Sequence, residues 1–384
     1  MNKSLNHYPG KLGIQQRVLP EYRAGFFDLL AEACEGGLSI FAGDVPLKET
    51  IPEASELNVA KYVKSQNYHF SDVASRYYFL WQRGLLDWLE KWDPDVLIVE
   101  ANPRYLSTNR AIQWMHSRGK AVIGWGLGAP PLEGSRTLGG QFNTFLRNYL
   151  RHRLYNQLDA MIAYSHRGAR EYRDFLSTHK QIYVATNAVA RRPTEISNER
   201  PPYFEDRPVV LYVGRIQKRK KIDHLIRTIA SLPEELHPEL WIVGDGPDRS
   251  NMEQLARKIY PKTKFFGIKK GESLSNIYRN ADLFVLPGTG GLAVQEAMSY
   301  ALPVIVAEGD GTQGDLVKPG NGWLIPSDDE EALLETLKIA LSAPERLRKM
   351  GKDSFRIVHD EVNIEQMVSI FIEAINHSAA RNTS

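Results

Sequence analysis

Short apolar runs alternate with amphipathic stretches along the whole chain, a pattern typical of parallel strands covered by helices. In the first half it predicts strands at Leu12–Val18, Leu38–Ala42, Val96–Glu100, Ala121–Trp125, Ala160–Ala163 and Ile182–Ala185. In the second half it predicts strands at Val209–Val213, Glu239–Val243, Lys264–Phe266, Leu283–Leu286, Val304–Ala307 and Gly322–Leu324. The predicted fold class is α/β, with two doubly wound sheets.

A polar stretch with three prolines, residues 191–207, interrupts this alternation and predicts an exposed linker. We therefore expect one Rossmann-like domain over residues 1–190 and a second over residues 208–360. A last helical stretch within 361–384 could pack on either domain, including back on the first. Two such domains predict a ligand site in the crevice between them, at the carboxyl ends of the strands.

Charge and cysteine content narrow the function classes. The 48 Lys and Arg residues nearly balance 46 Asp and Glu, a net charge of +2, so no global field recruits nucleic acid and any anion site must be local. The single cysteine, Cys34, excludes an intrachain disulfide and fits a reducing compartment. Met1–Gly13 lacks the apolar core of a signal peptide, and no apolar run reaches about 18 residues. We expect a cytoplasmic protein.

The segment from Ala281 to Ala307 reads as a complete βαβ unit with a glycine-rich loop. Gly288, Gly290 and Gly291 would let backbone N–H groups turn toward a diphosphate at a helix N-terminus, although a tight turn alone could also need them. Glu296 lies about one turn into the helix, where its carboxylate could accept a ribose diol. Otherwise it is a solvated helix residue.

A second cluster, Gly214–Lys221, contains five cations in eight residues and follows a predicted strand. Arg215 and Lys220 could neutralise the charge of a departing diphosphate. The alternative is an ordinary basic surface loop.

At these two stretches the sequence resembles retaining glycosyltransferases of the GT-B fold, family 4 (glycosyl transferases group 1). The resemblance runs from about Val209 to Leu341 and rests on four motifs in order. They are VGR with Lys220 and DHLI, then VGDGP, then FFG, and last ADLFVLP with GLAVQEAMSYALPVIV. It implies that Arg215 and Lys220 bind the diphosphate of a nucleotide sugar, the backbone around Ile268 the base, the backbone of Gly290, Gly291 and Leu292 the sugar and phosphate, and Glu296 the ribose.

Two positions depart from the family pattern. Gly288 stands where the family has the first of two glutamates, whose carboxylate meets donor sugar hydroxyls. Lys221 stands where the family usually has glycine. The first departure puts sugar selectivity in question.

The first half resembles the family in fewer segments. Pro20–Arg23 follows the first strand, as does the family loop that reaches phosphates and acceptor. Strand Val96–Glu100 is similar to one that in relatives ends in histidine near the donor sugar; here it ends in Glu100. One hypothesis places Glu100 beside the reacting sugar, acting on the acceptor hydroxyl. The other is a solvated carboxylate.

The acidic clusters do not predict a metal site. Asp93-Pro94-Asp95 has the Asp-x-Asp form but begins a buried strand, so we interpret it as a strand-entry turn. Asp328–Glu331 is interpreted as a charge cluster in the first turn of a helix. No zinc-ligand spacing is present. We expect no metal and no cofactor.

Arg147, Arg151 and Arg153 interleave with apolar residues in a basic amphipathic pattern. Such a helix could contact an anionic membrane that carries a lipid-linked acceptor, or it could pack on its own domain with its charges solvated.

The predicted function is retaining transfer of a hexose from a nucleotide-diphosphate sugar, by resemblance a UDP-hexose such as UDP-glucose. The acceptor would be a glycan, a lipid-linked or a small molecule. The alternatives are a GT-B sugar-nucleotide epimerase and a sugar-nucleotide-binding protein that has lost catalysis. A nicotinamide dehydrogenase is disfavoured because no G-x-G-x-x-G follows the first strand.

Overall fold

The computed structural model describes residues 7–46, 49, 52–73, 75, 77–132, 138–176, 180–196 and 200–382. Residues 1–6, on which part of the signal-peptide argument rested, lie outside the described residues. The chain forms two units, one of residues 1–186 with 364–384 and one of residues 187–363. The last helix thus belongs to the first unit.

The first unit is built on an eight-stranded sheet in the order β4-β3-β2-β1-β5-β6-β7-β8. Neighbouring strands are parallel except for the antiparallel pair of β3 and β4. The strands are β1 Leu12–Val18, β2 Leu38–Gly43, β3 Lys61–Phe70, β4 Phe79–Arg83, β5 Val96–Glu100, β6 Ala121–Gly126, β7 Ala160–Ala163 and β8 Gln181–Val184.

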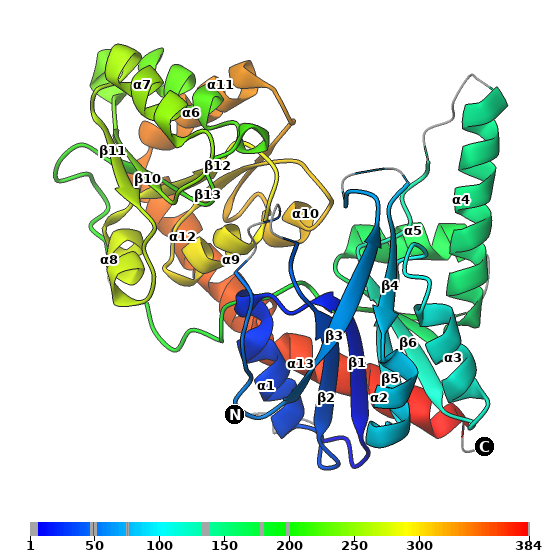
Figure 1. Ribbon diagram of the computed structural model, residues 1–384. Coiled ribbons are helices and arrows are strands. Elements are labelled where there is room, and N and C mark those ends of the chain that lie inside the picture. Colours follow the sequence, from blue (N-terminus) through cyan, green and yellow to red (C-terminus); the bar gives the residue numbers. More distant parts are fainter. Residues whose placement is uncertain are drawn as a thin grey trace. The chain divides into compact units, whose positions relative to one another are not determined.

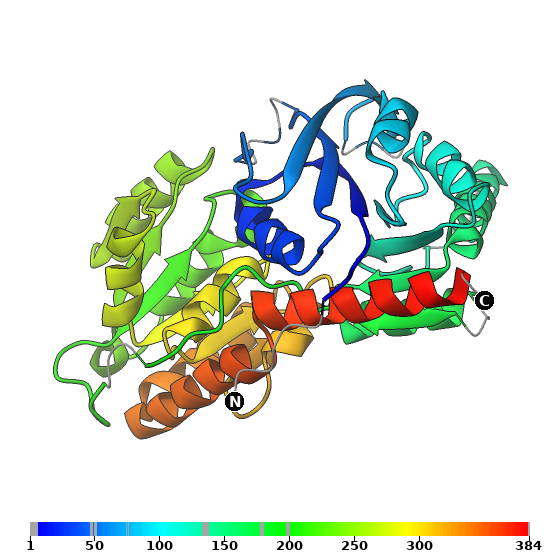
Figure 2. The ribbon, with the colours of Figure 1, turned by 90° about the horizontal axis from the view of Figure 1, so that it is seen from below.

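Helices cover both faces of this sheet. They are the 3-10 turn η1 Glu21–Arg23 and the helices α1 Ala24–Glu32, α2 Leu85–Trp92, α3 Thr108–His116, α4 Leu138–Gln157, α5 His166–Leu176 and α13 Ile364–Asn382. Figures 1 and 2 show α13, in red, running across the sheet, where it also packs on α1. Burial on both faces accounts for the nearly continuous apolar runs of the central strands.

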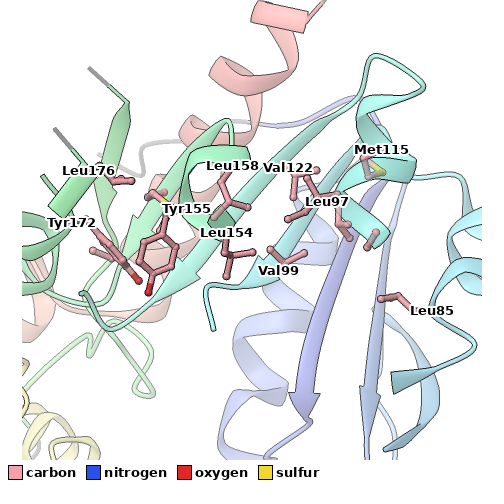
Figure 3. Close-up of a cluster of buried hydrophobic side chains, with 14 of the residues drawn as sticks. Leu85, Leu97, Val99, Met115, Val122, Leu154, Tyr155, Leu158, Tyr172 and Leu176 are labelled. Atoms are coloured by element: carbon pink, nitrogen blue, oxygen red, sulfur yellow. The ribbon is translucent and has the colours of Figure 1, made fainter. Parts of the chain in front are cut away.

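Two clusters form the core of the first unit. On one face, Leu97 and Val122 of the sheet pack with Met115 of α3, with Leu154 of α4 and with Leu158, which directly follows α4 (Figure 3). On the other face, Phe26 of α1 and Phe371 of α13 lie with their ring centroids 5.0 Å apart, and Trp125 of β6 lies 5.0 Å from Phe371. Trp125, the residue before the last of β6, therefore lies inside an aromatic cluster.

The second unit contains a six-stranded parallel sheet in the order β11-β10-β9-β12-β13-β14. Its strands are β9 Val209–Val213, β10 Glu239–Val243, β11 Thr263–Gly267, β12 Leu283–Leu286, β13 Val304–Ala307 and β14 Gly322–Ile325. The strand order reverses between β9 and β12. In open α/β sheets this switch point is where ligands bind.

Helices cover both faces of this sheet as well. They are η2 Lys218–Lys220, α6 Ile222–Ala230, η3 Glu234–Leu236, α7 Arg249–Ile259, α8 Glu272–Asn280, α9 Leu292–Ser299, α10 Gln313–Leu316, α11 Glu330–Leu341 and α12 Pro344–Asp360. In Figure 1, α6, α7 and α11 lie over one face, and α8, α9 and α12 over the other.

Every predicted strand is present, with ends shifted by no more than one residue. Strands β3 and β4 were not predicted. In the stretch predicted to be an exposed linker, the described residue Arg200 is anchored in the second unit. The Arg200 guanidinium donates hydrogen bonds to the carbonyl oxygens of Tyr278 and Arg279, at 2.9 and 3.0 Å.

Candidate functional site

The basic loop after β9 and the glycine loop after β12 contact each other at the switch point of the second sheet. The backbone N–H of Thr289 donates to the carbonyl oxygen of Arg219 at 3.2 Å, and the Arg219 guanidinium donates to the Thr289 hydroxyl at 2.9 Å. The Lys220 ammonium donates to the Thr289 carbonyl oxygen at 2.5 Å. Two clusters far apart in the sequence therefore form one site.

Close packing of these loops explains why residue 288 is a glycine. A Cβ atom built on Gly288 would lie 2.4 Å from the carbonyl oxygen of Arg219 and 2.6 Å from the Cα of Lys220. Both neighbours are backbone atoms and cannot rotate away. The glutamate expected from the family pattern does not fit this loop arrangement.

The surroundings of the Lys220 ammonium disfavour its charged form in the absence of an anion. Burial lowers the pKa of Lys220 to about 8, and the neighbouring positive charge of Arg219 adds to this effect. An incoming diphosphate would stabilise the charged ammonium. The site therefore contains a cation whose charge is incompletely balanced.

The N-terminus of α9 faces this loop region. Gly291 is its N-cap residue, and within the described residues no side chain caps the helix. Gln313, almost fully buried at 1% exposure, donates from Nε2 to the carbonyl oxygen of Gly290 at 2.7 Å. Gln313, which was not among the predicted site residues, holds the glycine loop from its position in α10. Gly290 has φ of 139°, a conformation that favours glycine.

Glu296 lies in α9 but is not a solvated surface residue. Its Oε2 accepts a hydrogen bond from the Tyr278 hydroxyl at 3.2 Å, and burial raises the pKa of its carboxyl. The Tyr278 ring stacks on Tyr300, with centroids 5.1 Å apart. The contact with ribose stays a prediction.

Arg215 and Ile268 follow strands of the same sheet, so their backbones lie at its carboxyl edge. The Tyr212 hydroxyl donates to the carbonyl oxygen of Arg215 at 3.1 Å, and this fixes the turn after β9. Ile268 follows Gly267 at the end of β11 and is 68% exposed. The contact of the Ile268 backbone with a base stays a prediction.

The backbone at position 221, the second departure from the family pattern, has a conformation that accounts for the glycine usual in the family. Lys221 has φ of 54°, in the left-handed region where glycine is favoured. Its ammonium forms an ion pair with Asp328 at 2.5 Å. Asp329 accepts a hydrogen bond from the Ala332 N–H at 2.8 Å and caps α11, as expected for a charge cluster at a helix start.

The first unit contains a cavity of about 650 Å³ at the carboxyl ends of β1, β5 and β6. Glu100 lines it and is half-buried, so the solvated alternative does not describe this residue. Its Oε1 accepts the backbone N–H of Arg17 at 3.1 Å, and the Tyr105 hydroxyl also donates to it. Burial raises the pKa of Glu100 despite these donors.

Asp93 and Asp95 lie at the opposite, amino end of β5. The Asp93 carboxylate pairs with Lys120 at 2.6 Å, and Asp95 accepts the Lys11 backbone N–H at 2.8 Å. They are strand-entry residues, as predicted. Among the residues that the structure describes, no cluster of three or more His, Cys, Asp or Glu side chains is suited to a metal ion.

Helix α4 combines features of both interpretations of its basic pattern. Leu154 is buried in the core, whereas Phe145 is 68% and Tyr149 is 53% exposed. No helix within the described part of the chain is long and apolar enough to cross a bilayer. Contact with a membrane surface stays a prediction.

The side chain of Gln295, next to Glu296 in the sequence, links separate segments of the second unit by hydrogen bonds. Gln295 is fully buried, and its Oε1 accepts the backbone N–H groups of Val189 and Ala190 at 2.6 and 3.2 Å. Its Nε2 donates to the Val362 carbonyl oxygen at 2.6 Å. Sequence reasoning missed this residue because its partners are far away along the chain.

Comparisons with known proteins agree with this geometry. Residues 194–356 match the family model described as glycosyl transferases group 1. The sulfoquinovosyl transferase of Arabidopsis thaliana is 32% identical over 164 residues, covering 41% of this chain and 30% of that protein. A GDP-mannose-dependent alpha-mannosyltransferase of Mycolicibacterium smegmatis is 34% identical over 146 residues, covering 37% and 36%. The matches span about a third of the length of these curated relatives.

Solved structures match over nearly the whole chain. Sucrose-phosphate synthase from Thermosynechococcus elongatus has a TM-score of 0.71 at 18% identity, covering 97% of this chain and 99% of that one. The Anabaena protein HepE in complex with UDP has a TM-score of 0.67 at 13% identity, covering 96% and 99%. Residues 194–356 thus match the model of the glycosyl transferases group 1 family, and the chain has the GT-B fold of two Rossmann-like units.

Proposed function

We propose that the protein is a hexosyltransferase that binds a nucleotide-diphosphate sugar in its second unit and transfers the hexose to an acceptor bound by the first. The observation that carries the proposal is the contact of Lys220 and Arg219 with Thr289, which places cations beside the N-terminus of α9 at a sheet switch point. Cations and helix N-terminal N–H groups together suit a diphosphate.

The chemistry follows from the charge that develops as the glycosidic bond breaks. The departing nucleoside diphosphate gains negative charge, and Arg215, Lys220 and the backbone of Gly290, Gly291 and Leu292 stabilise it. Glu296 accepts hydrogen bonds from the ribose hydroxyls, and the backbone at Ile268 contacts the base. Stabilising the leaving group in this way needs no metal ion, and we propose transfer with retention of the anomeric configuration.

We propose a UDP-hexose such as UDP-glucose as the donor. HepE, which shares the fold, is solved in complex with UDP and with UDP-glucose. Other relatives are named as GDP-mannose-dependent, so a GDP-sugar is the donor against which this choice is tested. Because Gly288 offers no carboxylate to the sugar, we expect looser discrimination among hexoses than among nucleotides.

Glu100 is proposed to act on the acceptor hydroxyl. Its raised pKa favours proton uptake, and it lines the cavity of the first unit. A Glu100→Gln variant that keeps most of its transfer rate would exclude this role.

Incubation of the full chain with UDP-glucose, followed by NMR, tests the proposal. We expect slow release of UDP and of glucose that is first formed as the α-anomer, with the rate unchanged by excess chelator. Epimerised donor would instead identify an epimerase. UDP binding without hydrolysis, and without transfer to any acceptor, would indicate a binding protein.

A further inference from the structure

The cavity of the first unit is unusually rich in arginine. Its lining contains five guanidinium groups, contributed by β1, η1, the loop after β5 and α4, namely Arg17, Arg23, Arg104, Arg147 and Arg151. The one carboxylate in the same lining is that of Glu100. Cations are therefore gathered at the carboxyl edge of a sheet that has its own switch point between β1 and β5.

Among the described residues, a carboxylate pairs with only one of these arginines. Arg17 forms a two-pronged pair with Glu49, at 3.1 and 2.8 Å. Arg104 donates to the neutral side chain of Asn102 at 3.3 Å, and Arg151 to the carbonyl oxygen of Pro130 at 2.8 Å. In the described parts of the chain, no carboxylate pairs with Arg104, Arg147 or Arg151.

Arg23 gives the strongest indication that a ligand binds in this cavity. It is 6% exposed, and its Nη1 has no hydrogen-bond partner within the described residues, although it lines the cavity. Its Nη2 donates to the Tyr164 hydroxyl at 3.2 Å, and the guanidinium lies 4.4 Å from the centre of the Trp125 ring. A buried N–H donor without a partner at the wall of a cavity indicates that a bound ligand supplies the missing acceptor.

The remaining arginines repel one another. The pKa of Arg147 is lowered by burial and then by the charges of Arg151 and Arg104. Such mutual repulsion is relieved by an anion placed between the guanidinium groups.

We propose that the acceptor carries a phosphate or diphosphate group, which Arg23, Arg104, Arg147 and Arg151 bind in this cavity. The inference rests on the proposed function, since it names the class of acceptor. A phosphate fits better than a carboxylate because it brings more than one charge and three oxygens for forked guanidinium donors. The bound group anchors the acceptor at the cavity that Glu100 also lines.

Pyrophosphate binding to the full chain tests this site. Saturating UDP first occupies the donor site of the second unit, and calorimetry then measures pyrophosphate binding to the remaining site. For the double variant Arg147→Ala/Arg151→Ala we expect affinity lower by at least about tenfold, since two charge-assisted contacts are lost. Arg153→Ala is the matched control, because Arg153 is exposed on the same helix and does not line the cavity.

Failure of the inference can be told apart from failure of the proposed function. If UDP binds but pyrophosphate does not bind in its presence, or binds the double variant as tightly as the wild type, the anionic acceptor site is wrong and the donor site stands. If UDP itself does not bind, the proposed function fails. The pyrophosphate titration, repeated in Lys220→Ala, then judges the arginine site alone by the same comparison of variants.

Two further arms identify the source of the phosphate. A soluble acceptor predicts that glucose 1-phosphate competes with pyrophosphate while phosphatidylcholine vesicles containing phosphatidic acid do not bind. A lipid-linked acceptor predicts sedimentation of the protein with those vesicles, lost in Arg147→Ala/Arg151→Ala and kept in Arg153→Ala. If neither the sugar phosphate nor the vesicles interact with the cavity, the proposal of a phosphorylated acceptor is overturned.

Discussion

The side-chain ammonium of Lys220 lies 2.5 Å from the carbonyl oxygen of Thr289 and donates a hydrogen bond to it. This bond joins the loop after β9 to the loop after β12, across the point where the strand order of the second sheet reverses. The same ammonium is half-buried with a lowered pKa, and an arriving diphosphate would favour its charged form.

Lys220→Ala should weaken UDP binding by roughly ten- to a hundredfold, as expected for loss of a charge-assisted contact. Titration calorimetry measures the affinity, and uridine, which lacks the diphosphate, should bind both proteins alike. Lys218→Ala is the control, since Lys218 is exposed in the same turn. Equal losses in the two variants would mean that the basic loop acts only through its general charge.

The affinity for UDP should depend on pH in a defined direction. Because the pKa of Lys220 in the free protein is about 8, its ammonium is charged below this pH and becomes neutral above it. UDP affinity should therefore fall between about pH 7 and about pH 9, and the fall should be much smaller in Lys220→Ala. An identical pH profile in the variant would assign the dependence to another group.

Glu296 should recognise the ribose hydroxyls. The wild-type protein should bind UDP about tenfold more tightly than 2′,3′-dideoxy-UDP, because the analogue leaves the carboxylate without its partners. In Glu296→Gln this preference should shrink, as the neutral amide makes weaker hydrogen bonds. If the variant retains the full preference, Glu296 has a structural role through Tyr278 instead.

Gly288→Ala should damage the site although it adds only one methyl group. The new Cβ would overlap the backbone of Arg219 and Lys220, so we expect a loss of about 1–3 kcal/mol in unfolding free energy and weaker UDP binding. Thermal unfolding with and without UDP measures both effects. Gly314→Ala is the control because nothing lies within 4 Å of its added Cβ; a Gly288→Ala protein as stable as this control would contradict the packing argument.

Gln295→Leu should lower the unfolding free energy of the second unit by about 3 kcal/mol, since it leaves the buried Val362 carbonyl and the half-buried N–H groups of Val189 and Ala190 without this partner. Differential scanning calorimetry would record this as a lower midpoint. The surface substitution Gln254→Leu on α7 should leave the midpoint nearly unchanged. A small effect of Gln295→Leu would indicate that water replaces its amide.

The sequence was sufficient to predict strands that are buried on both faces, because their apolar runs are continuous. Strand β3, Lys61–Phe70, was missed because polar residues alternate through it and most of its side chains are at least partly exposed. Strand β4 pairs with it at the sheet edge and is only five residues long. Neither strand carries the apolar run on which the prediction depended.

The donor site could be predicted in part because its residues occur in two short segments with recognisable spacing. The reason for Gly288 could not, since it lies in the backbone of a loop that is distant in the sequence. The arginine cavity was likewise out of reach. Arg23, Arg104 and Arg147 belong to separate segments, and only the fold brings them to one cavity.

Thermal unfolding of the full chain with UDP, UDP-glucose, GDP and GDP-mannose is the most direct test that a nucleotide-diphosphate sugar is the donor. A ligand at about 100 times its Kd stabilises the folded protein by roughly 3 kcal/mol, so UDP and UDP-glucose should raise the midpoint by several degrees and uridine should not. Stabilisation by the GDP ligands alone would replace the proposed donor. No shift with any of the four nucleotides would contradict the account.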